Sequence, residues 1–118
     1  MAFFRKGYEM TLNRVHDTIT IKEGNEKLTL TVNGDAMRMV AGLNKAQAKL
    51  KSINDDSTMD EIREAADLFA AVIFGTEQAE KLMAFYADDA SCVVNVCGQY
   101  FKERLAKKIS AVQKKIRA

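Results

Sequence analysis

The 118-residue sequence has no proline, no tryptophan, two cysteines and a single histidine. Two cysteines are too few for a disulfide framework, which is typical of a cytosolic protein. One histidine, His16, excludes most transition-metal sites and His-based catalytic triads. The lack of proline and the presence of only six glycines argue against collagen, flexible linkers and most loop-rich all-β domains. The sequence also lacks an apolar run of the ~18 residues that a membrane span needs, and no secretory signal is expected at its start.

What remains is an ordinary globular composition, with 47% hydrophobic and 29% charged residues. The length predicts one domain with a modest core. The net charge of +2 is unevenly distributed: residues 1–54 carry +4, residues 55–89 carry −8 and residues 90–118 carry +6. Such blocks are either solvated faces or surfaces that attract another copy of the chain or a partner of mixed charge.

A β-hairpin is predicted near the N-terminus. Residues 18–21 and 28–32 alternate in hydropathy and are rich in β-branched side chains, and Gly24 and Asn25 between them suit a turn. The predicted apolar face consists of Ile19, Ile21, Leu28, Leu30 and Val32. Because a lone hairpin is marginally stable, this face must pack on another element. Residues 1–14 are either an extra strand or a mobile, partner-binding arm.

From residue 35 onward the apolar pattern changes to a helical period. Asp35 is expected to cap a first helix that ends near residues 54–56, and Thr58 with Glu61 fits a capping box for a second. Gly75 is the expected left-handed terminator of the second helix, and Thr76 the cap of a short third. The sequence thus predicts an α+β, mainly α fold. In it, residues 15–118 form a single domain in which a β-hairpin precedes about four helices, the last one long.

The last helix is the most regular feature, with Asp88 or Asp89 as its cap. Its apolar stripe consists of Val93, Cys97, Phe101, Leu105, Ile109, Val112 and Ile116. A helix of that length spans ~40 Å, whereas a globule of this size is ~30 Å across, so the C-terminal end is expected to project. Gly98 is a weak point that could mark a kink, a close contact or a break. The candidate partner or oligomer interface is therefore Phe101, Leu105, Ile109, Val112 and Ile116.

No catalytic, cofactor-binding or metal site is predicted. Cys92 and Cys97 would lie ~140° apart on a helix, too far round to chelate one metal ion, and both are expected to be buried. No glycines are spaced to cradle a phosphate. A basic patch on the last helix offers a different function, the binding of nucleic-acid phosphates. Its members are Lys107, Lys108, Lys114, Lys115 and Arg117.

The second half of the chain resembles a known family. The segment that carries the resemblance is Phe74-Gly75-Thr76-Glu77-Gln78-Ala79-Glu80-Lys81-Leu82-Met83-Ala84-Phe85-Tyr86. It is similar to a recurring pattern in small tail assembly chaperones of tailed phages and prophages of Gram-positive bacteria. In these, a helix ends at Phe-Gly, a short helix carries Lys-Leu and Phe-Tyr pairs, and a long helix follows. The hairpin that ends at residues 31–35 is similar too, so the resemblance covers roughly residues 15–112.

The resemblance implies a non-enzymatic protein of the bacterial host cytoplasm that needs no cofactor. Such chaperones form homo-oligomers and coat the long helical tape-measure protein before tail tube subunits polymerise around it. The expected partners are therefore further copies of the chain, the tape-measure protein and the tail tube protein, with no membrane involved. Two alternatives remain: a small nucleic-acid-binding regulator that uses the basic C-terminal helix, or a structural subunit of the virion.

Overall fold

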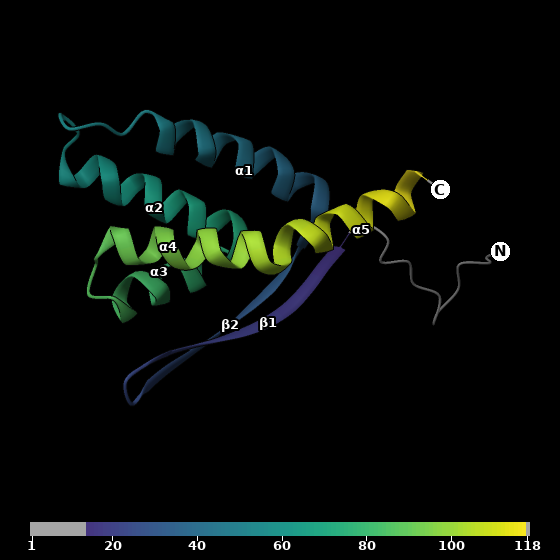
Figure 1. Cartoon of the computed structure of the whole chain (residues 1–118), viewed down its shortest axis with the longest axis horizontal. Helices are drawn as coiled ribbons and strands as arrows, with labels where there is room; N and C mark the ends of the chain where they lie inside the picture. Colours follow the sequence, from purple (N-terminus) through teal and green to yellow (C-terminus); the bar gives the residue numbers. More distant parts are fainter. Residues whose placement is uncertain (1–13, 118) are drawn as a thin grey trace.

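A computed structural model describes residues 14–117 of the chain, without the side chains of the last two. Its elements are β1 (Arg14–Glu23), β2 (Glu26–Asp35), α1 (Ala36–Lys51), α2 (Met59–Phe74), α3 (Thr76–Phe85), α4 (Ala90–Tyr100), a π-helical turn (Phe101–Leu105) and α5 (Ala106–Arg117). The predicted fold class, mainly helical α+β with an N-terminal hairpin and a long last helix, is confirmed (Figure 1). Of the predicted N-terminal arm, residues 1–13 lie outside the described residues, and Arg14 begins β1.

The hairpin pairs β1 and β2 antiparallel, with Ile19 opposite Leu30. Gly24 begins its two-residue turn at φ +60°, a conformation that glycine adopts without strain. The predicted apolar face is confirmed, because its five residues are buried or packed against the core. Val15, which is not among the five predicted residues of this face, is also buried there. The hairpin thus contributes one side of the hydrophobic core and leaves its other side in solvent.

The helix boundaries follow the predicted caps with three corrections. The Asp35 carboxylate accepts hydrogen bonds from the first turn of α1, and the capping box of Thr58 and Glu61 is present at α2. Gly75 has positive φ, but its ψ of 158° is extended instead of left-handed helical. It serves as the N-cap of α3, so Thr76 is the first helical residue and not the cap. The first helix also ends earlier than expected, at Lys51.

Helix α2 is the centre of the helical layer, and it contacts α1, α3, α4 and β2. Small side chains allow these close contacts: Ala65, Ala66 and Ala70 are fully buried on α2. On α1, a Cβ added to Gly42 would lie only 2.8 Å from a methyl carbon of Val72. Close packing of α1 on α2 therefore depends on the absence of a side chain at residue 42.

The last helix runs from Ala90 to Arg117 without a break at Gly98. Within it, the amide of Ala106 donates to the carbonyl of Phe101, an i to i+5 bond that defines the π-helical turn. Steps of four residues drift ~40° per step on an α-helix, so the predicted stripe could not stay on one face. The π turn corrects this drift, because the buried residues on either side of it are Tyr100 and Leu105, five positions apart.

The expectation that the C-terminal end would expose its apolar residues is wrong for two of them. Ile109 and Val112 are only 6% and 8% exposed, and both belong to the core of the single chain. The reason is that α5 contacts both β1 and α1. The last helix is thus covered by the start of the hairpin and the start of the first helix, which a one-dimensional pattern does not place beside it.

Candidate interaction surfaces

The five predicted interface residues fall into three environments. Leu105, Ile109 and Val112 are buried in the core, so they are not a free surface of the single chain. The side chain of Ile116 lies outside the described part of the structure. Phe101 alone is half-buried and lines a groove. Among the residues that the structure describes, Phe101 is therefore the predicted interface residue that remains available to a partner.

An apolar groove of about 250 Å³ lies between α1 and the π turn, above α2. Its lining residues come from three helices and are Leu43, Gln47, Leu50, Phe69 and Phe101. Leu43, Phe69 and Phe101 are partly buried against the core, so their positions are held by packing from below. Gln47 is the one exposed residue among the five. We call this surface the helical groove.

The shape of the helical groove follows from local structure. The π turn begins at Phe101, which places that ring off the buried line of Tyr100 and Leu105 and toward α1. On the other wall, the close approach of Gly42 to Val72 sets how near α1 lies to α2. Apolar grooves between helices bind the apolar face of an amphipathic helix in many complexes. The helical groove has the chemistry for that kind of contact.

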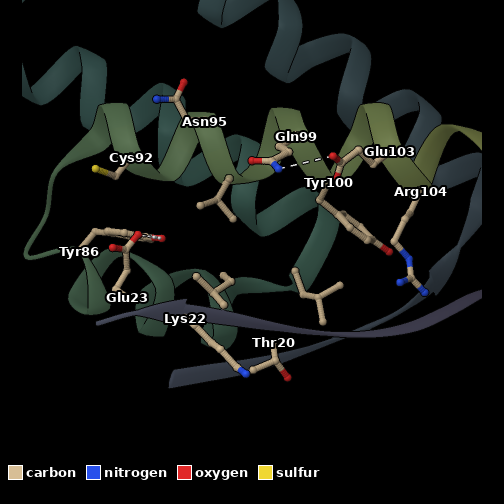
Figure 2. A pocket seen from close by; sticks show the side chains of 13 residues that line it. Thr20, Lys22, Glu23, Tyr86, Cys92, Asn95, Gln99, Tyr100, Glu103 and Arg104 are labelled. Carbon is tan, nitrogen blue, oxygen red and sulfur yellow. Dashed lines mark hydrogen bonds between the residues drawn. The ribbon is translucent and has the colours of Figure 1, made fainter. Parts of the chain in front are cut away.

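A second cleft, of about 490 Å³, lies between the hairpin and α4 and the π turn. Figure 2 shows Tyr100 and Arg104 at one end of it and Tyr86 with Glu23 at the other. The Tyr86 hydroxyl donates to the Glu23 carboxylate at 3.2 Å. The lining is mixed, because the apolar side chains of Ile19, Ile21 and Val96 lie among polar and charged residues. We call this surface the hairpin cleft.

A polar cluster fastens β1 to the last helix at one end of the hairpin cleft. The Tyr100 hydroxyl donates to Asp17 Oδ2 at 2.9 Å, and Arg104 donates to Asp17 Oδ1 at 2.8 Å. Burial by itself raises the pKa of the Asp17 carboxyl. Hydrogen bonds from Tyr100 and Thr18, with the positive charges of Lys108 and Arg104, outweigh this effect and hold the pKa below its ordinary value of 3.8. Asp17 is therefore a half-buried residue whose carboxylate, with the side chain 6% exposed, stays charged because it is paired.

The cysteines differ from each other. Cys97 is fully buried, and burial raises its pKa to about 12, so its thiol stays protonated at neutral pH. Cys92 is half-buried at the hairpin cleft, and the prediction that both would be buried is correct for Cys97 only. Within residues 14–117, no group of three His, Cys, Asp or Glu side chains is placed to hold a metal ion. None of the helices described has the length and apolarity to cross a membrane.

The charge blocks of the sequence map to different ends of the molecule. An open hollow is lined, together with Arg63, by acidic residues of α2, α3 and the turn after α3, and these are Asp60, Glu64, Asp67, Glu80 and Asp88. In the basic patch on α5, Lys107, Lys114 and Lys115 are exposed and Lys108 is half-buried, while the side chain of Arg117 lies outside the described part. The molecule thus has an acidic region and a basic region on separate elements.

Comparison with protein-family models, with curated proteins and with solved structures found no match for this chain.

The helical groove and the hairpin cleft differ in how far the sequence predicted their residues. Phe101 of the helical groove was a predicted contact residue, whereas Leu43 and Phe69 were not among the predicted contact residues. The cluster of Asp17, Tyr100 and Arg104 was not predicted, because Asp17 lies more than 80 positions from the other two in the chain.

Proposed function

We propose that the protein is a non-enzymatic, phage tail assembly chaperone-like protein that binds amphipathic helices in its helical groove. The observation that carries this proposal is the groove itself, an apolar surface built from three helices with the Phe101 ring at its wall. The tape-measure protein, which is long and helical, is the partner that the resemblance implies. Its apolar side chains would fill the groove in the way that helical ligands fill interhelical grooves.

Self-association is the second part of the proposal. The acidic region on α2 and α3 and the basic patch on α5 have opposite charge and lie on different elements. Opposite patches on separate faces favour head-to-tail contacts between copies, which form rings or open filaments. The proposed setting is the bacterial host cytoplasm, where many copies would cover one tape-measure chain.

The first experiment is an affinity pull-down from the source bacterium after prophage induction, with half of the sample treated with nuclease. We expect a tape-measure or tail tube protein among the partners, and we expect it to survive nuclease. Partners that vanish with nuclease would instead support a nucleic-acid-binding regulator that acts through the basic patch. In that case the affinity for nucleic acid would fall steeply as the salt concentration rises. Presence of the protein in purified particles would support a virion subunit.

A matched pair of variants then tests the helical groove. Gln47→Glu places a carboxylate in the groove, whereas Ala48→Glu places the same charge on the next residue of α1, which is exposed and does not line the groove. Burying an unpaired charge under a bound helix is costly. We therefore expect Gln47→Glu to weaken binding of the recovered tape-measure fragment by about tenfold or more, measured by titration calorimetry. Equal affinities of the two variants would contradict binding in the helical groove.

A further inference from the structure

The hairpin cleft opens along one edge of the hairpin. Five consecutive residues of β1, from Ile19 to Glu23, line it, and no residue of β2 does. The opposite wall comes from α4 and the π turn, whose lining residues include Asn95, Val96 and Gln99. Figure 2 shows that the side chains of Thr20 and Lys22 point away from the helix, so the inner face of β1 faces the cleft. The hairpin cleft is therefore a space beside β1 and under α4 that neither strand of the hairpin fills.

The backbone of β1 at this edge has hydrogen-bonding capacity to spare. In an antiparallel pair, alternate residues turn their N–H and C=O groups away from the partner strand. The amide of Thr31 on β2 bonds a side chain outside the sheet, so its opposite residue Thr18 also faces outward, followed by Thr20 and Lys22. Within residues 14–117, no partner for the amides of Thr20 and Lys22 is found. An open edge of this kind readily accepts another strand.

The two edges of the hairpin differ in whether another element hydrogen-bonds their backbone. Gln78 of α3 covers the β2 edge: its Oε1 accepts from the Thr31 amide at 2.8 Å, and its Nε2 donates to the Thr31 carbonyl at 2.6 Å. The amide group of Gln78 thus takes the place of one residue of a neighbouring strand. This cover of the β2 edge is limited to Thr31, whereas no side chain of another element bonds the backbone of β1 at residues 18–22 within residues 14–117, and the β1 edge adjoins the cleft.

We propose that the hairpin cleft binds an extended segment from the first 13 residues of the same chain, added antiparallel to β1 as a third strand. These residues lead directly into Arg14, the first residue of β1, so the segment is tethered at one end of the edge that it would pair with. Tethering raises its effective concentration far above that of a free ligand. Five residues cover the edge from Thr18 to Lys22, and 13 residues supply these together with a connecting turn.

The sequence of the segment matches the cleft. Tyr8, Met10 and Leu12 alternate with polar residues, so one face of the segment is apolar. An antiparallel return with that face toward α4, through a two-residue turn at residues 12 and 13, would pair Gly7 with Thr18 and Phe3 with Lys22. The cleft residues Ile21 and Ile19 would then lie beside Phe4 and Lys6, and Tyr8 would lie beside Asp17, as alternate side chains do when a peptide is added to a sheet. This proposal concerns a different surface from the helical groove and does not depend on it.

The test is amide hydrogen exchange of the full chain, measured residue by residue by NMR. We expect the amides of Thr20 and Lys22 to exchange about tenfold or more slowly than that of Thr29, which faces the outer edge of β2. Exchange of Thr20 and Lys22 as fast as that of Thr29 in the unmodified chain would overturn the proposal without any variant.

A matched pair of variants identifies the segment. With the apolar face toward the cleft, odd-numbered residues of the segment turn their backbone toward β1, so Gly7→Pro removes a donor and Gly7→Ala keeps it. We expect protection of Thr20 and Lys22 to fall to the level of Thr29 in Gly7→Pro and to persist in Gly7→Ala. Unchanged protection in Gly7→Pro would overturn the proposal. We also expect protection to be independent of protein concentration, and its loss on dilution would overturn the assignment by showing that a second copy supplies the strand.

Discussion

Tyr100 and Phe101 are neighbours in the sequence, yet their side chains face different elements, β1 for Tyr100 and α1 for Phe101. Tyr100 is 5% exposed, packs against Phe74 with ring centroids 5.9 Å apart, and donates its hydroxyl to Asp17 on β1. Phe101 is half-buried, makes no polar contact, and lines the helical groove on the side of α1. The hairpin side of this helix thus makes its polar and packing contacts within the chain, whereas the α1 side retains apolar surface in the helical groove.

The largest expected effect is on the free energy of unfolding, when a buried residue and a half-buried residue of the last helix are each replaced by alanine. Leu105→Ala empties a fully buried site just beyond the π turn and should lower the free energy of unfolding by about 2–5 kcal/mol. Phe101→Ala should cost about 1–2 kcal/mol, because the ring is already half in water. Urea denaturation of both variants measures the difference. Equal losses would mean that Phe101 is ordinary core and would break the comparison.

The polar contact on the hairpin side gives an intermediate effect that depends on pH. Tyr100→Phe removes the hydroxyl that bonds Asp17 and should cost about 1–2 kcal/mol at pH 7. The pKa of Asp17 is lower in the folded chain than its ordinary 3.8, so its stabilising contribution is complete above about pH 5 and is lost as the pH falls through the folded-state pKa.

The gap in unfolding free energy between the unmodified chain and Tyr100→Phe should therefore shrink as the pH is lowered from 7 to about 3. Denaturation of the two chains at a series of pH values measures this gap. An Asp17→Asn background is the control, since the gap there should not vary with pH. A gap that stays constant in the unmodified background would show that the charge of Asp17 does not strengthen this contact.

The smallest expected effect concerns two helical glycines. A Cβ at Gly98 would meet no atom within 4 Å, so Gly98→Ala should raise the free energy of unfolding by about 0.5–1 kcal/mol through helix propensity alone. Gly42→Ala should lower it, because the added Cβ would collide with Val72 on the wall of the helical layer. Thermal denaturation of both variants gives the two signs. A destabilising Gly98→Ala would reveal a close contact at that position.

Local chemistry made much of the fold predictable. The caps at Asp35 and Asp89 and the capping box at Thr58 are confirmed, because a cap depends on residues within three positions of each other. The apolar face of the hairpin was correct for the same reason, since alternation along a strand is a local property. The functional surfaces were less predictable, because the helical groove needs the spatial order of three helices and the cluster at Asp17 joins residues more than 80 positions apart.

By itself, the sequence determined the elements, most of their ends and which residues are apolar, because these follow from side-chain chemistry and from the periods of helix and strand. Only the tertiary structure decided which apolar residues are buried. Ile109 and Val112 are core and not interface because α5 is covered by β1 and α1. Phe101 faces the groove because a π turn corrects the drift of a stripe spaced by fours. Both outcomes depend on contacts between elements distant in the chain, and no local pattern encodes such contacts.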